Sequence, residues 1–138
     1  MPSQNSELLH QIQTLIQQDG RYRTNAYLFV LSGLDFTLEQ LQRRNETDPD
    51  KRHVTGRELS LGIRDYALRE FGPSAKMVLE HWGLLTTRDF GHIVYSLIGI
   101  GLMGKNDKDS LEDFNDVFDF EEEFIRNFRF RLADFRNN

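Results

Sequence analysis

The chain has 138 residues, and its 17 Lys and Arg against 22 Asp and Glu give it a formal net charge of −5. Hydrophobic residues make up 38% and charged residues 28% of the sequence, which indicates a globular and not a disordered protein, and the length predicts one domain spanning residues 1–138. The sequence contains no cysteine, which excludes disulfides, thiolate nucleophiles and every metal centre that needs cysteine ligands.

Apolar residues three and four positions apart predict a series of amphipathic helices. In chain order, the apolar stripes run over residues 8–16, 26–34, 59–67, 75–82 and 90–102. Breaks rich in glycine, proline, asparagine and aspartate separate them at residues 19–20, 48–50, 72–73, Gly83 and 104–107. No alternation of strands with helices is present, so we predict an all-α fold, a single compact domain of seven or eight helices.

Three segments fit the capping box that marks the start of a helix: Thr37–Gln40, Thr55–Glu58 and Thr86–Asp89. In this motif the threonine side chain accepts a backbone N–H three residues on, and the acid or amide at that position accepts the backbone N–H of the threonine. Each box is also flanked by two apolar residues placed to form a hydrophobic staple. We therefore expect helices to start at these three threonines.

Two features are left open by the sequence. Residues 128–132 (Phe-Arg-Phe-Arg-Leu) alternate like a short strand and are equally typical of a helix end. Gly62, Gly91 and Gly99 lie inside predicted helices, where each glycine costs about 0.5–1 kcal/mol relative to alanine. Either a close approach of two helices or a ligand lying against the backbone explains these glycines.

No segment is predicted to cross a membrane. The longest nearly apolar stretch is residues 93–103, with 11 residues. A transmembrane helix needs about 20 residues. The first ten residues carry no Lys or Arg and are followed by no apolar signal-peptide core, so we expect a cytoplasmic protein with no membrane partner.

The sequence matches cofactor-binding and metal-binding motifs only in part. Gly99, Gly101 and Gly104 fit the dinucleotide-binding pattern G-x-G-x-x-G, but a helical pattern precedes them where the motif requires a strand. Asp89 and His92 share one helix face and offer two metal ligands, without an evident third. The acid-rich residues 107–124 fail as an EF-hand because loop position 5 is Leu111 when the loop starts at Asp107 and Val117 when it starts at Asp113. We expect no cofactor and no metal site.

An enzyme is one alternative function. The polar side chains that could line a catalytic cleft are His53, Arg64, Asp89 and His92, grouped by their polarity alone. Neither H-E-x-x-H nor G-x-S-x-G occurs, and no catalytic residues can be assigned. The sequence therefore favours a protein without catalytic activity, with a small enzyme built around these residues as the lesser alternative.

A nucleic-acid-binding protein is the other alternative. Residues 74–103 resemble a helix-turn-helix pair, and Arg88, His92 and Tyr95 would point outward from its second helix, as in a degenerate winged-helix-like protein. Of these three residues only Arg88 carries a permanent positive charge, and the segment that follows is acidic. Because neutralisation of phosphates supplies most of the non-specific affinity, the charge pattern argues against a nucleic-acid partner.

The most prominent charge pattern is acidic and aromatic. Residues 105–123 carry nine acids against two lysines, a net charge of −7, and phenylalanines are interleaved with them. Our leading interpretation is a non-catalytic binding or scaffolding module that docks a protein partner, or a second copy of itself, through this surface. Its candidate residues are Asp113, Phe114, Phe118, Phe120, Glu121 and Phe124. A solvated helical face whose aromatic side chains close the core would give the same pattern.

Several motifs together resemble a bacterial family. They include His53-Val-Thr-Gly-Arg-Glu-Leu59, Phe71-Gly72, Thr87-x-Asp-Phe-Gly91 and Ile93-Val-Tyr95, and the match extends over roughly residues 22–124. Their combined spacing resembles the conserved hypothetical family restricted to the planctomycete and verrucomicrobial group. This chain has Thr55 where the family pattern has serine, and Tyr95 where it has phenylalanine. The family carries no assigned catalytic residues, so the resemblance adds no functional site.

Overall fold

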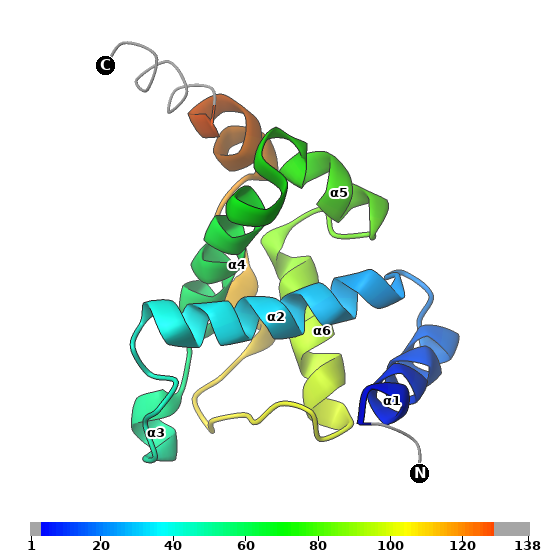
Figure 1. Cartoon of the computed structure of the whole chain (residues 1–138), viewed down its shortest axis with the longest axis vertical. Helices are drawn as coiled ribbons and strands as arrows, with labels where there is room; N and C mark the ends of the chain where they lie inside the picture. The colour runs from blue at the N-terminus through cyan, green and yellow to red at the C-terminus, as the bar shows by residue number, and fades with distance from the viewer. Residues whose placement is uncertain (1–3, 129–138) are drawn as a thin grey trace.

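The computed structural model describes residues 4–128, and all their regular structure is helical (Figure 1). The α-helices are α1 (Gln4–Gln18), α2 (Thr24–Gln40), α3 (Pro49–Arg52), α4 (Gly56–Phe71), α5 (Ala75–His81) and α6 (Thr87–Gly99). Shorter turns form the 3-10 helices η1 (Gly72–Ser74) and η2 (Leu111–Phe114) and the π-helix η3 (Glu122–Arg126). No helix in this part of the chain is long and apolar enough to span a bilayer.

The all-α class is confirmed for residues 4–128, but they hold six α-helices and not seven or eight. After α6 the chain forms turns because polar side chains bind nearby backbone N–H groups. Asp109 accepts the N–H of Asn106 at 2.7 Å, and Ser110 accepts that of Glu112 at 3.2 Å. Such local bonds compete with helix formation. Of the segment 128–132, only Phe128 is described, and it is helical; the rest lies outside the described residues.

Two of the three predicted helix starts are confirmed. Thr55 and Glu58 form the complete capping box at the start of α4. At the start of α6, Asp89 accepts the backbone N–H of Thr86 at 3.0 Å. The start predicted at Thr37 is wrong, because Thr37 is buried inside α2 and its hydroxyl donates to the carbonyl four residues earlier, at 2.6 Å. The capping pattern at Thr37 is therefore a chance match within a longer helix.

The core lies where α2 crosses α4 and α6 (Figure 1). The contact between α2 and α4 is close: a Cβ atom on Gly62 of α4 would overlap the Thr37 hydroxyl of α2. On α6, a Cβ atom on Gly91 would lie 2.8 Å from the ring of Phe114 in η2. Helix packing thus explains Gly62 and Gly91. Gly99, in contrast, faces open space.

The segment after α6 returns across this helix and is held there by one buried hydroxyl. Thr87 donates a hydrogen bond to the backbone carbonyl of Phe114 at 2.6 Å and accepts the backbone N–H of Val117 at 3.2 Å. Thr87 is 1% exposed, so both bonds are made inside the core. Residues 100–114 are therefore anchored at the start of α6 and wrap back around its end.

Candidate functional site

The expected nucleic-acid face on α6 does not form a free surface. Arg88 is exposed, and its guanidinium donates to the side-chain oxygen of Asn115 at 2.5 Å. His92 is partly buried, and the hydroxyl of Tyr95 is fully buried. A recognition helix has to expose one side to enter the major groove. Because α6 packs against α2 on one side and η2 on another, it is a central core helix and not the exposed member of a helix-turn-helix pair.

The four polar residues expected to line a catalytic cleft are divided among three places, and of the four only Asp89 and His92 lie near each other. His53 pairs with Asp109, and Arg64 lies 3.5 Å from Glu123. Asp89 accepts the hydroxyl of Tyr22 at 2.5 Å and the backbone N–H groups of residues 85 and 86. The cluster expected from the sequence is therefore dispersed, and Asp89 serves to cap α6 and to tie it to the chain before α2.

His92 is the one member of that cluster near Asp89, and its surroundings disfavour a charge. Burial lowers the pKa of His92 below its ordinary value, and the positive charges of Arg21 and Arg88 lower it further. The carboxylates of Asp89 and Asp19 oppose this shift without reversing it. These surroundings therefore favour the neutral form of the His92 imidazole.

The acidic–aromatic surface of residues 113–124 loses most of its aromatic side chains to the core. Phe114, Phe120 and Phe124 are 4%, 4% and 0% exposed, and Phe118 is partly buried against them. Phe120 stacks on Phe90 of α6 with ring centroids 5.7 Å apart. The acids Asp113 and Glu121 remain exposed. What faces solvent here is therefore an acidic surface, and the aromatic part of the expected docking site closes the core instead.

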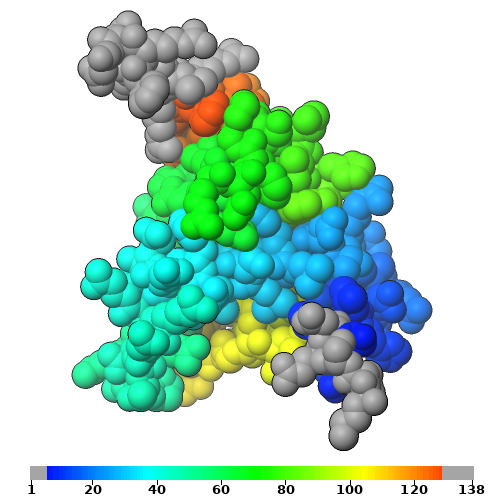
Figure 2. Space-filling view, viewed as in Figure 1, coloured from blue at the N-terminus to red at the C-terminus, as the bar shows by residue number. Residues whose placement is uncertain are grey.

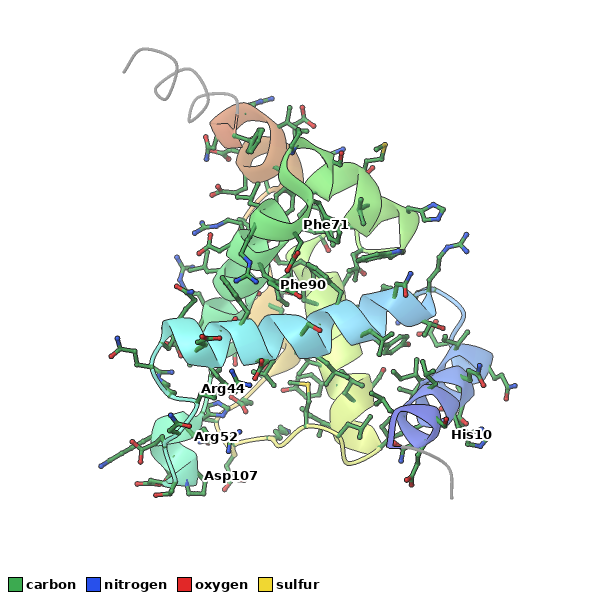
Figure 3. The ribbon with its side chains drawn as sticks, in the orientation of Figure 1. His10, Arg44, Arg52, Phe71, Phe90 and Asp107 are labelled. Carbon is green, nitrogen blue, oxygen red and sulfur yellow. The ribbon has the colours of Figure 1, made fainter. Side chains whose placement is uncertain are left out.

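A pocket of about 420 Å³ lies on a face that the sequence did not single out as a site. It opens beneath α2, between α3, the end of α6 and the segment that follows. Figure 2 shows this side hollowed next to α3, where the yellow residues that end α6 and follow it recede behind α2. In Figure 3, Arg52 marks the α3 side and Asp107 the segment after α6. The pocket is thus built by elements far apart in the chain.

The inner wall of the pocket is apolar. Its apolar side chains come from α2, α4, α6 and the segment after α6: Leu34, Leu38, Leu59, Val94, Ile98, Met103 and Phe114. An apolar wall of this kind is typical of sites for small organic molecules, whose bodies lose contact with water on binding.

The polar side of the pocket is held by a histidine–aspartate pair. The Nε2 atom of His53 lies 2.8 Å from Oδ1 of Asp109, and both side chains are largely buried, at 25% and 20% exposure. The backbone carbonyl of His53 accepts a hydrogen bond from Arg43 at 2.9 Å, and Arg43 in turn pairs with Glu58 in α4. The His53–Asp109 contact joins the loop before α4 to the segment after α6. The two bonds of Arg43 hold this loop against the start of α4.

Tyr95 projects from α6 to the pocket lining, and its hydroxyl is an exception among the buried polar groups. In the part of the chain whose side chains are described, residues 6–128, its Oη is the one buried side-chain oxygen or nitrogen without a hydrogen-bond partner. Burial raises the pKa of the Tyr95 hydroxyl, and the negative charges of Asp109 and Asp113 raise it further. The ammonium group of Lys105 lies 5.6 Å from the centre of the Tyr95 ring.

Of the residues singled out from the sequence, the pocket brings together His53, Tyr95, Asp113 and Phe114, which the sequence assigned to three different hypotheses. Sequence reasoning missed Asp109, since its partner is 56 residues away. For Tyr95 the sequence offered one sign that its hydroxyl is buried: the residue directly follows Ile93 and Val94, which belong to the core. In the described part of the chain no three His, Asp or Glu side chains are grouped as metal ligands.

Comparisons of the chain with models of protein families, with curated proteins and with solved structures found no match. The geometry of the pocket and the chemistry of its lining therefore carry the functional argument.

Proposed function

We propose that the protein is a non-catalytic binding module and that its ligand is a small organic molecule seated in the pocket beneath α2. The observation that carries this proposal is the buried, unpartnered hydroxyl of Tyr95 at the lining of a largely apolar cavity of about 420 Å³. The proposal keeps the binding function favoured by the sequence. It moves the binding site from the acidic segment to the pocket.

The energetics of buried polar groups support this assignment. More than about 90% of buried polar groups in proteins have a hydrogen-bond partner, and leaving one unpaired costs about 1–3 kcal/mol. The hydroxyl is closed to solvent in this structure, so a ligand would reach it only after a side chain of the lining moves, and a polar ligand atom bonded to it would then recover that cost. The volume of the pocket also lies within the range of about 300–1,000 Å³ that is typical of small-molecule sites.

The histidine–aspartate pair also supports the proposal, because it holds two walls of the pocket together. Asp109 accepts both the His53 ring nitrogen and the backbone N–H of Asn106, so its two carboxylate oxygens are engaged in holding the wall of the pocket. The pair thereby fixes the shape of the site. A fixed site loses less conformational entropy when a ligand binds, which favours affinity.

The test is a ligand-observed NMR screen of a library of small fragments against the wild type and a variant with a filled pocket. Met103→Trp places a large ring at the partly buried lining, and we expect it to abolish binding of the fragments that bind the wild type. Met77→Trp is the matched control, because Met77 lies on α5, 68% exposed and outside the pocket, and binding should be unchanged. A library without hits, or hits that bind both variants equally, would contradict the proposal.

A further inference from the structure

We propose that the pocket selects an organic cation, a molecule with an apolar body and a protonated amine. This inference rests on the proposed function, since it names the class of ligand for the same pocket. It is carried by the arrangement of the polar groups around Tyr95 and by the contrast between them and the apolar inner wall.

The first argument is the sign of the charge around the unpartnered hydroxyl. Asp109 and Asp113 both line the pocket, and both act electrostatically on the Tyr95 hydroxyl. A ligand carboxylate or phosphate placed at that hydroxyl would be repelled by two negative charges. An ammonium group in the pocket would be attracted by both of them.

The second argument is the face of the Tyr95 ring. The ring already attracts an ammonium group of the protein itself, that of Lys105, at 5.6 Å from its centre. Cations are drawn to the face of an aromatic ring by its quadrupole, and the attraction grows when water is excluded. Because Lys105 is exposed, its flexible side chain can leave the ring when a ligand amine arrives.

The positive side chains of the lining do not reverse this preference. Arg52, Lys105 and Asp113 are all exposed, so water and salt screen their three charges, whereas Asp109 is only 20% exposed and its charge is screened less. His53 is paired with Asp109 on the partly buried side of the pocket. The segment that carries Asp109 and Asp113 has a net charge of −7 over residues 105–123, which adds a field of the same sign.

The test compares three probes of nearly the same shape: 2-phenylethylamine, 2-phenylethanol and 3-phenylpropanoate. They carry a positive charge, no charge and a negative charge at neutral pH. Affinities are measured by calorimetric titration of the full chain at low ionic strength. We expect the amine to bind about tenfold more tightly than the alcohol and the carboxylate to bind most weakly. Rising salt should reduce the advantage of the amine.

A charge-neutralising variant locates the effect. Asp113→Asn removes one carboxylate of the lining and should weaken the amine several-fold while leaving the alcohol unchanged. Asp116→Asn is the matched control. It lies outside the pocket, and its φ of 49° is one that asparagine adopts readily. Equal effects of the two variants on the amine would overturn the inference.

The outcomes separate the two proposals. Equal affinities of the amine and the alcohol, or a tighter carboxylate, would overturn the inference about charge and leave the pocket as a binding site. If none of the three probes binds, the inference is also overturned. The proposed function then depends on the fragment screen, in which Met103→Trp provides the independent readout.

Discussion

Two tyrosine hydroxyls of this chain lie in opposite environments. The hydroxyl of Tyr22 donates to the carboxylate of Asp89 at 2.5 Å, whereas that of Tyr95 is buried without a partner. Tyr95→Phe removes an unsatisfied polar atom, so we expect the free energy of unfolding to rise by about 1 kcal/mol. Tyr22→Phe removes the hydrogen bond to Oδ1 of Asp89, while Oδ2 keeps its backbone partners, and should lower it by about 1.5–3 kcal/mol. Urea denaturation measures both, and a loss of stability in Tyr95→Phe would show that its hydroxyl has a partner.

Glu58 links the capping box of α4 to the loop that carries His53. Burial raises the pKa of Glu58, but hydrogen bonds from Arg43 and Thr55 outweigh burial and hold the pKa below its ordinary value. A lowered folded-state pKa adds stability above the unfolded-state pKa, and this stability is lost as the pH falls through the folded-state value. Glu58→Gln should therefore cost about 1 kcal/mol at neutral pH, and the difference from the wild type should vanish in acid.

The matched control for this prediction is Glu39→Gln. Glu39 is 66% exposed, and its contact with Arg44 is 3.6 Å long, so its removal should change stability by no more than a few tenths of a kcal/mol at any pH. Stability curves against pH from thermal or urea unfolding distinguish the two. A Glu58→Gln difference that stays constant down to low pH would contradict the role assigned to this carboxylate.

At the scale of helices, the contact between α2 and α4 depends on Gly62. A Cβ atom there would overlap the Thr37 hydroxyl, so Gly62→Ala should overpack the interface and cost about 1–3 kcal/mol. Gly99→Ala is the control at the end of α6, where the added methyl group meets open space and should raise stability by up to about 1 kcal/mol. Equal effects of the two substitutions on the urea midpoint would contradict the close approach.

Sequence patterns predicted a helix correctly where contacts between residues close together in the sequence determine it. The capping boxes at Thr55 and Thr86 and the apolar stripe of α6 are such cases. The box at Thr37 failed because burial against α4, a contact distant in the sequence, decided its conformation. The phenylalanines of the acidic segment were predicted to form a docking surface because the core contact that buries them also involves a residue distant in the sequence. Their burial and the stacking of Phe120 on Phe90 of α6 show that they close the core.

At the scale of the whole molecule, the candidate site could not be predicted as a unit. Its lining comes from α2, α3, α4, α6 and residues 102–114, and the pair His53–Asp109 joins segments 56 residues apart. The sequence did flag His53, Tyr95, Asp113 and Phe114, but under three different hypotheses. What it could not supply is their common location, which depends on how the turn after α6 returns across the helix.

The central claim is that a small molecule binds in the pocket beneath α2, and a map of backbone amide shifts tests it most directly. Uniformly ¹⁵N-labelled protein is titrated with 2-phenylethylamine and followed by two-dimensional ¹H–¹⁵N NMR. We predict saturable shifts concentrated at His53, Tyr95, Met103 and their neighbours, with Glu121 and the acidic surface around it unchanged. Shifts confined to that acidic surface, or no saturable shifts with any fragment of the library, would contradict the account.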